Sequence, residues 1–250
     1  MSLPRSIFLC VLLTMTLLTP VLLFAQGDVQ TPPPETKESL WTLIKKGGPV
    51  MYPLGLCSIL AVTFIIERAI SLRRSNLCPP GFMSGLFQAF DGSQSKVDEG
   101  VNYCLRTDSS TGEIFAAGVR HLPRGSREAE EAIADVGARE TDRLFRSLIG
   151  LKTIGQVSPL LGLLGTVYGM IGAFQQLAAG TAGSKSEKLA KGIYEALVTT
   201  ATGLSIAIPV IIAHVLLRKS LDSTIGEIDK LREEFAVHYF TDTDVDSLKK

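Results

Sequence analysis

A glutamate and two threonines share one stripe of a long apolar segment, and these are the residues whose types and spacing could do chemistry. Residues 193–217 read IYEALVTTATGLSIAIPVIIAHVLL, and Glu195 is the only Asp, Glu, Lys or Arg among them. Glu195, Thr199 and Thr202 stand at i, i+4 and i+7, so they lie on one side of a helix. A carboxylate buried in hydrocarbon must be hydrogen-bonded or must face water. The stripe therefore suits the lining of a water-containing path.

Other polar residues adjoin this stripe, and simpler interpretations of them stay open. Thr200 and Gly203 lie beside it, and Thr166 is its nearest counterpart in the preceding apolar run, residues 155–177. A threonine in a membrane helix often bonds only to a carbonyl of its own helix, four residues earlier. Glu195 lies near the start of its run, so a place at the headgroup level is the alternative to a place inside the membrane.

Glycines recur in the first run with a spacing that predicts close helix packing. In such a pattern the small residues fall along one side of a helix and let a neighbouring backbone approach. The predicted packing glycines are Gly155, Gly162, Gly165, Gly169 and Gly172 in the first run and Gly203 in the second.

Three apolar segments are long enough to cross a bilayer at about 20 residues per helix. They predict transmembrane helices over residues 50–70, 151–178 and 191–217. Basic residues lie at or just beyond the end of the first, at or just before the start of the second and just after the third, which predicts that those three ends are in the cytoplasm. The basic residues are Arg68, Arg73, Arg74, Arg143, Arg146, Lys152, Arg218 and Lys219. The C-terminus is then cytoplasmic, and the mature N-terminus lies outside.

The remaining segments complete an all-α membrane protein whose long helices extend into the cytoplasm. Residues 1–25 look like a secretory signal peptide, with an uncleaved first span as the alternative. We expect a periplasmic tether and interfacial helix over 26–49 and a periplasmic loop over 179–190. Helical spacing of apolar residues predicts a cytoplasmic helical region over 71–150 and a cytoplasmic helical tail over 218–250.

Composition and motifs argue against several other classes of protein. Basic and acidic residues are equal at 25 each, so charge does not indicate nucleic-acid binding. The histidines are isolated from one another and from the cysteines, so no metal-ligand spacing is present in the sequence. It also contains no phosphate-binding loop and no nucleophile elbow, so we predict no catalytic residue, no cofactor and no enzyme activity.

Two blocks resemble the paired signature of the MotA/TolQ/ExbB proton-channel family, on its ExbB side. They are SPLLGLLGTVYGMIGAF at 158–174 and KGIYEALVTTATGLSIAIPVIIAHVLL at 191–217. With residues 47–70, the resemblance covers about half of the chain and all of its mature membrane portion. It implies that Thr166, Glu195 and Thr200 hold the positions of the family's pore-facing polar residues. Helical geometry favours Thr199 over Thr200, so both remain open.

The resemblance also implies partners and a role. Similar proteins form a pentameric homo-oligomer in the bacterial inner membrane, where the second and third helices surround an ExbD-like single-span subunit that carries the proton-binding aspartate. Such a motor energises outer-membrane uptake through a TonB-like transducer, and its other contact is membrane lipid. A TolQ-like role in envelope integrity and a passive membrane scaffold are the alternatives. A flagellar stator fits less well, since that branch usually has four spans.

Overall fold

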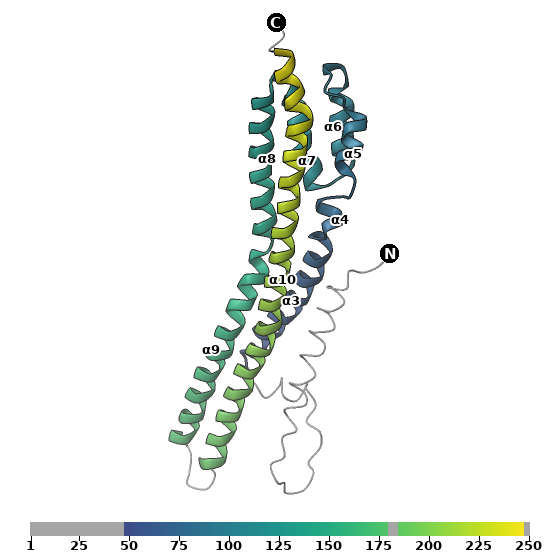
Figure 1. Cartoon of the computed structure of the whole chain (residues 1–250). Helices are drawn as coiled ribbons and strands as arrows, with labels where there is room; N and C mark the ends of the chain where they lie inside the picture. Colours follow the sequence, from purple (N-terminus) through teal and green to yellow (C-terminus); the bar gives the residue numbers. More distant parts are fainter. Residues whose placement is uncertain (1–47, 180–184, 248–250) are drawn as a thin grey trace. The chain divides into compact units, whose positions relative to one another are not determined.

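A computed structural model describes residues 48–179 and 185–247, and in that part of the chain all regular secondary structure is helical (Figure 1). The predicted signal segment, nearly all of the predicted tether and interfacial helix, and residues 180–184 of the predicted loop lie outside the described residues. The chain divides into two compact units. The described residues up to Ile66 and Gly150–Val215 form the membrane unit, and Glu67–Ile149 with the residues from Leu216 onward form the polar unit.

Three helices in the described residues are long and apolar enough to cross a membrane. They are α3 (Met51–Ser71), α9 (Ile149–Ala179) and α10 (Lys185–Ser247). For the part of the chain that the structure describes, the prediction of an all-α protein with three spans is therefore confirmed. α10 begins inside the range predicted as loop, and it runs on through the predicted tail as one helix.

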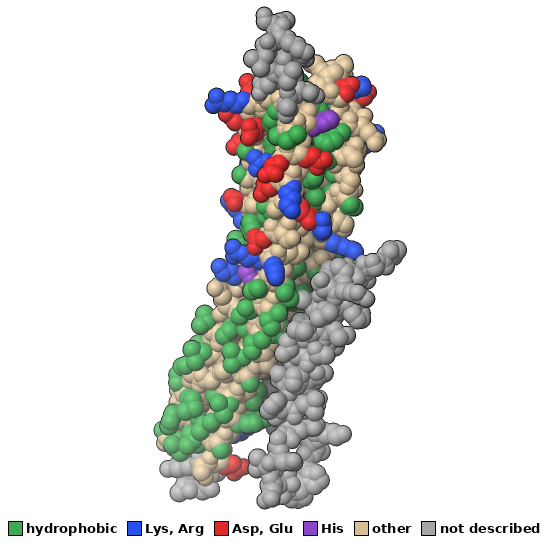
Figure 2. Space-filling model, in the orientation of Figure 1, with side chains coloured by type: hydrophobic (Ala, Val, Ile, Leu, Met, Phe, Trp, Pro, Cys, Tyr) green, Lys and Arg blue, Asp and Glu red, His purple; other side chains and the backbone are tan. Residues whose placement is uncertain are grey.

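In the membrane unit, α9 and α10 form an antiparallel pair against which α3 packs (Figure 1). Val50, Met51 and Leu54 at the start of α3 form a buried cluster with Leu161 of α9 and Ile206 of α10. The opposite side of α3 exposes large apolar side chains, namely Tyr52, Leu56, Ile59, Leu60, Val62 and Ile66. Figure 2 shows that hydrophobic side chains dominate the visible surface of this unit. An exposed apolar surface of this kind suits contact with lipid.

The polar unit contains the helices expected between the first two spans. They are α4 (Arg74–Leu77), α5 (Phe82–Ala89), η2 (Gln94–Lys96), α6 (Val97–Arg106), α7 (Ser110–His121), η3 (Leu122–Arg124) and α8 (Ser126–Ser147). Ser109 caps α7 by accepting a hydrogen bond from the Gly112 amide at 3.1 Å. Gly125, whose φ of 136° suits glycine, separates η3 from α8.

The core of the polar unit joins these helices to the second half of α10. Its fully buried large side chains include Leu86, Phe90, Phe115, Val119 and Phe235. Phe235 of α10 packs against Phe115 of α7, with ring centroids 5.5 Å apart and the rings tilted by 46°. Apolar burial of this kind is the main stabilising contribution available to such a unit.

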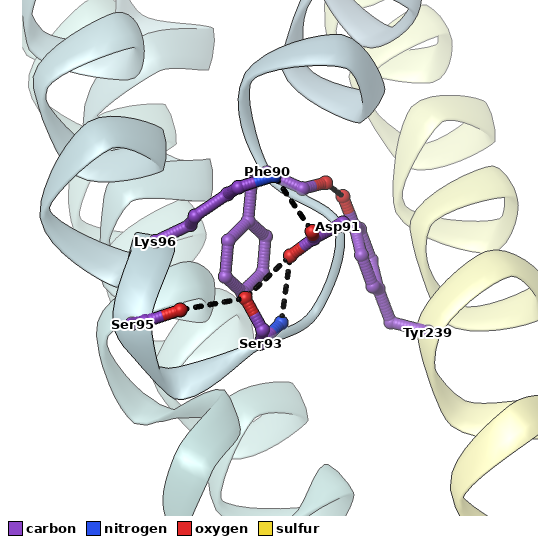
Figure 3. A network of polar contacts seen from close by, with 6 residues as sticks. All are labelled: Phe90, Asp91, Ser93, Ser95, Lys96 and Tyr239. Atoms are coloured by element: carbon purple, nitrogen blue, oxygen red, sulfur yellow. Dashed lines mark hydrogen bonds and ion pairs between the residues drawn. The ribbon is translucent and has the colours of Figure 1, made fainter.

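A hydrogen bond ties the end of α10 to the loop after α5 (Figure 3). Tyr239 Oη donates to the backbone carbonyl of Phe90 at 2.6 Å, and burial raises the pKa of Tyr239. In the adjoining loop, Lys96 Nζ and Ser93 Oγ donate to Asp91 at 2.8 and 2.6 Å. These donors hold the pKa of Asp91 below its usual range, because they favour its ionised form. The network fixes the loop against the helix core.

Candidate functional site

The glycines of α9 permit a close approach to α10 within one subunit. A Cβ added at Gly162 would lie 3.1 Å from the Thr200 Cα and 3.4 Å from the Gly203 Cα. One added at Gly203 would lie 2.7 Å from the Ser158 carbonyl oxygen. Because these neighbours are backbone atoms, they cannot yield as a flexible side chain would. The contact depends on the absence of a side chain at both positions.

The same antiparallel register continues along both helices. Gly165 packs on the Thr199 side chain. A Cβ added at Gly169 would lie 3.0 Å from the Ala196 Cβ. A Cβ added at Gly155 would lie 3.0 Å from Ile211 Cγ1. Gly172 differs from the other predicted packing glycines, since a Cβ there would meet nothing within 4 Å.

The glycines predicted from the sequence did not include Gly192, at the N-terminal end of the α10 surface that packs on α9. A Cβ at Gly192 would lie 2.5 Å from the Ala173 Cβ, so Gly192 also belongs to the helix contact. The signal was available in α10, where small residues recur at steps of three and four. These are Gly192, Ala196, Thr199, Gly203 and Ala207.

Three of the four predicted pore threonines satisfy their hydroxyls within their own helix. Thr166 donates to the Leu163 carbonyl at 2.7 Å, Thr199 to that of Glu195 at 2.8 Å, and Thr202 to that of Val198 at 2.8 Å. This is the local bonding that the simpler interpretation gave. Thr200 is different, because its hydroxyl donates across the pair to the Gly162 carbonyl at 3.0 Å.

The structure distributes the predicted pore residues over two sides of the α9–α10 pair. Thr200 bonds to Gly162, and Thr166 lies one turn beyond Gly162 on the same side of α9. Thr202 lies one turn before Ile206, which packs against the start of α3. Glu195 continues the stripe of Thr202 and Ile206, so it shares the side that faces α3.

Thr199 lies between these two sides. Its side chain is only 1% exposed and packs against Gly165 of α9. The structure therefore places Thr199 in the contact between two helices of the same subunit.

Glu195 is the one Asp or Glu in the apolar runs 155–177 and 193–217, whereas Glu67 lies near the C-terminal end of α3. Glu195 is half-buried on α10, and no Asp, Glu, Lys or Arg separates it from Arg218. α9 carries no such residue after Lys152. A carboxylate near one end of the run and the His214 imidazole near the other, with hydroxyls between them, do not by themselves supply titratable groups through the thickness of a membrane.

Comparison with known proteins gives the family. Residues 106–230 match the sequence profile of the MotA/TolQ/ExbB proton channel family. The chain is 32% identical to the biopolymer transport protein exbB1 of Vibrio cholerae over 196 residues, which cover 77% of this chain and 85% of that protein. It is 29% identical to the Tol-Pal system protein TolQ of Pseudomonas aeruginosa over 212 residues, or 79% and 90% of the two chains.

A third relative is an ExbB-like biopolymer transport protein of Synechocystis, which is 38% identical over 166 residues. That match covers 65% of this chain and 64% of the relative. The family match includes all of α9 and most of α10, the two helices that carry the packing glycines and the polar stripe. The chain belongs to the MotA/TolQ/ExbB proton channel family and is a membrane-embedded subunit of that class.

Proposed function

We propose that this chain is the ring-forming subunit of a proton-driven motor in the bacterial inner membrane. The observation that carries the proposal is Glu195, a half-buried carboxylate and the one Asp, Glu, Lys or Arg of residues 193–217, where His214 lies near the opposite end. Such a span needs a second protein to complete a path for protons. An ExbD-like single-span subunit with a membrane carboxylate would supply the missing group. Each proton that crosses would release about 2.3 kcal/mol per 100 mV of membrane potential.

The geometry supports a specific arrangement of the pore. α3 covers the side of the pair that carries Ile206, whereas the side with Thr166 and Thr200 faces away from that contact. In a pentameric ring with α3 on the outside, Thr166 and Thr200 line the axis, and Thr199 acts in packing. Glu195 and Thr202 then lie toward α3 or the adjoining subunit and reach the pore from its edge. The N-terminal side is periplasmic and the C-terminus cytoplasmic, as the basic residues at the span ends indicate.

The role that we favour is energising a TonB-like transducer for outer-membrane transport. It is supported by the ExbB-named relatives, which include the Vibrio cholerae protein. A TolQ-like role in envelope integrity is the second candidate, because the TolQ relative matches a larger share of this chain.

Complementation of strains that lack the chromosomal genes tests both roles. We expect Glu195→Gln and Thr200→Val, at normal protein levels, to abolish or strongly reduce the rescued activity. Thr63→Val is the matched control, since the Thr63 hydroxyl bonds to its own helix at the Ile59 carbonyl on an exposed side of α3. Rescue of growth on scarce iron identifies the ExbB-like role, and rescue of detergent resistance identifies the TolQ-like role. Full activity of both variants would refute the pore assignment and leave a passive scaffold.

A further inference from the structure

A glutamate interrupts the buried face of α8 in the polar unit. Ile133 and Leu144 of this helix both pack into apolar clusters. Glu140 lies seven residues after Ile133 and four before Leu144, so it is on the same side of the helix. Its side chain is only 12% exposed, and a carboxylate in such a place needs polar partners, because burial without them is costly. One partner is Arg143 of the same helix, whose guanidinium lies 3.3 Å from the Glu140 carboxylate.

The other partner is a second carboxyl group, that of Glu113 in the first turn of α7. The register of the two helices accounts for the contact, since a Cβ added at Gly118 of α7 would lie 2.5 Å from Ile133 Cδ1 of α8. Only η3 and Gly125 join the two helices, which therefore run in opposite directions. Glu113 precedes Gly118 by five residues and Glu140 follows Ile133 by seven, so the two carboxyl groups lie at similar levels. They share a hydrogen bond.

A hydrogen bond between two carboxyl groups requires a proton, because two carboxylates are both acceptors. Partial burial and the neighbouring Glu140 raise the pKa of Glu113 above its ordinary 4.5, and Asp108 in the α6–α7 loop raises it further. Arg143 and the N-terminal turn of α7 act in the opposite direction, since both favour a negative charge. Arg143 contacts Glu140, so the proton belongs on Glu113, which is exposed and can exchange it with water.

The charged residues of α10 near this level make contacts of their own. α10 packs on the same face of α8, where Gly118 of α7 lies close to both Ile133 and Phe235. Glu227 pairs with Arg74 at 2.6 Å, and Asp229 pairs with Arg232 at 3.4 Å. The charges that act on the carboxyl pair are therefore those of α8 and of the α6–α7 loop.

We propose that Glu113 and Glu140 form a pH-sensitive latch that fastens the first turn of α7 to α8. With one proton, the pair makes a charge-assisted hydrogen bond between the two helices, and Arg143 balances its single negative charge. Without the proton, two negative charges face each other and repel. The latch lies beside the bond that joins α7 to α4, in which the buried Thr111 hydroxyl donates to the Leu77 carbonyl at 2.6 Å. This role does not depend on the proposed pore.

The test is the pH dependence of reversible unfolding of the full chain in detergent, followed by circular dichroism. The proton-bound latch contributes fully below the ordinary pKa of 4.5, and its contribution is lost as the pH rises through the raised pKa of Glu113. Glu113→Gln keeps a donor for Glu140 at every pH and cannot titrate. The folding equilibrium constant of the wild type, relative to that of Glu113→Gln, should therefore fall with rising pH by up to about tenfold per pH unit and then level off. Arg143→Gln removes a cation that favours loss of the proton, so it should move this fall to higher pH.

Infrared difference spectroscopy gives a second readout that does not depend on stability. At pH values above 4.5, where an ordinary glutamate is mostly ionised, the difference between the wild type and Glu113→Gln should contain the C=O band of a protonated carboxylic acid. Glu131→Gln is the matched control, because Glu131 is an exposed carboxylate of α8 that pairs with Arg127 of its own helix at 3.2 Å. Its difference spectrum should lack the band.

Two results would overturn the proposal. One is a pH profile of the wild type that runs parallel to that of Glu113→Gln. The other is a Glu113→Gln difference spectrum that lacks the carboxylic acid band, or a Glu131→Gln spectrum that contains it as strongly.

Discussion

The Thr200 hydroxyl donates to the Gly162 carbonyl across the α9–α10 contact, 3.0 Å away and 38 residues earlier in the chain. The hydroxyl proton is committed to this bond, so Thr200 can present only its oxygen lone pairs to a third group. Close approach makes the bond possible, because neither Gly162 nor Gly203 places a side chain between the backbones.

Thr200→Val should weaken the α9–α10 pair, since valine keeps the shape and removes the bond between helices. Hydrogen bonds between membrane helices contribute about 0.6 kcal/mol on average and up to about 1.7 kcal/mol. Thr202→Val is the control, because its hydroxyl bonds only to the Val198 carbonyl of its own helix. Reversible unfolding in detergent should show the larger loss for Thr200→Val. Equal losses would mean that the bond between the helices contributes nothing beyond a local one.

Gly203→Ala should be destabilising by about 1–3 kcal/mol, the usual cost of overpacking a close contact. The new methyl group would meet the Ser158 carbonyl oxygen at 2.7 Å, and neither backbone can move without parting the helices. Gly172→Ala is the matched control on α9, where the added Cβ meets nothing within 4 Å and the helix gains up to about 1 kcal/mol of propensity. Thermal unfolding in detergent compares the two. A loss in Gly172→Ala as large as that in Gly203→Ala would place another chain against Gly172.

Cys104 should resist alkylation in the folded protein. Burial raises the pKa of the Cys104 thiol to about 12 from an ordinary 9.0. At pH 8 only about one molecule in ten thousand then carries the reactive thiolate. We expect N-ethylmaleimide to modify a variant that keeps only Cys104 far more slowly than one that keeps only Cys78, which is half-buried.

The same shift predicts an alkaline loss of stability. The neutral Cys104 thiol contributes fully to the free energy of unfolding below pH 9, and that contribution disappears as the pH rises toward 12.

The alkylation prediction is checked by mass spectrometry after pulse labelling, with and without denaturant, which measures the rate at which each cysteine is modified. Rapid labelling of Cys104 without denaturant at neutral pH would show that the polar unit opens readily.

Tyr239→Phe should destabilise the polar unit by about 1–3 kcal/mol, the cost of leaving a buried acceptor unpaired. The lost bond is the 2.6 Å contact from Tyr239 Oη to the Phe90 carbonyl. Tyr103→Phe is the control, because its bond to the Phe82 carbonyl is longer, at 3.2 Å, and only partly buried. Denaturant unfolding followed by circular dichroism measures both variants.

Tyr239 should also make stability fall at alkaline pH. Burial raises its pKa, so the neutral phenol contributes fully below the unfolded value of about 10, and the contribution is lost as the pH rises beyond it. Tyr239→Phe should show a smaller decrease in unfolding free energy between pH 8 and pH 10.5 than the wild type. Parallel pH profiles would exclude Tyr239 as the titrating group.

The sequence by itself determined the three spans, the helical class and the family blocks. Each of these depends on features read along one segment, such as an apolar run that is long enough or small residues repeated every turn. The segment between the first two spans was likewise readable as helices, because Met83, Leu86 and Phe90 repeat at helical steps and are buried in the structure. The contact between Phe90 and Tyr239 was not readable, since no local pattern links residues 149 positions apart.

Only the tertiary structure decided which side of each span faces which neighbour. Helical spacing correctly aligned Glu195, Thr199 and Thr202 on one stripe, but a stripe about 60° wide can divide at the edge of a helix contact. α9 covers Thr199, and α3 packs against Ile206, one turn after Thr202, while Thr200 turns to the opposite side with Thr166. That division depends on where two other helices lie around α10, and this information is absent from the periodicity of α10 itself.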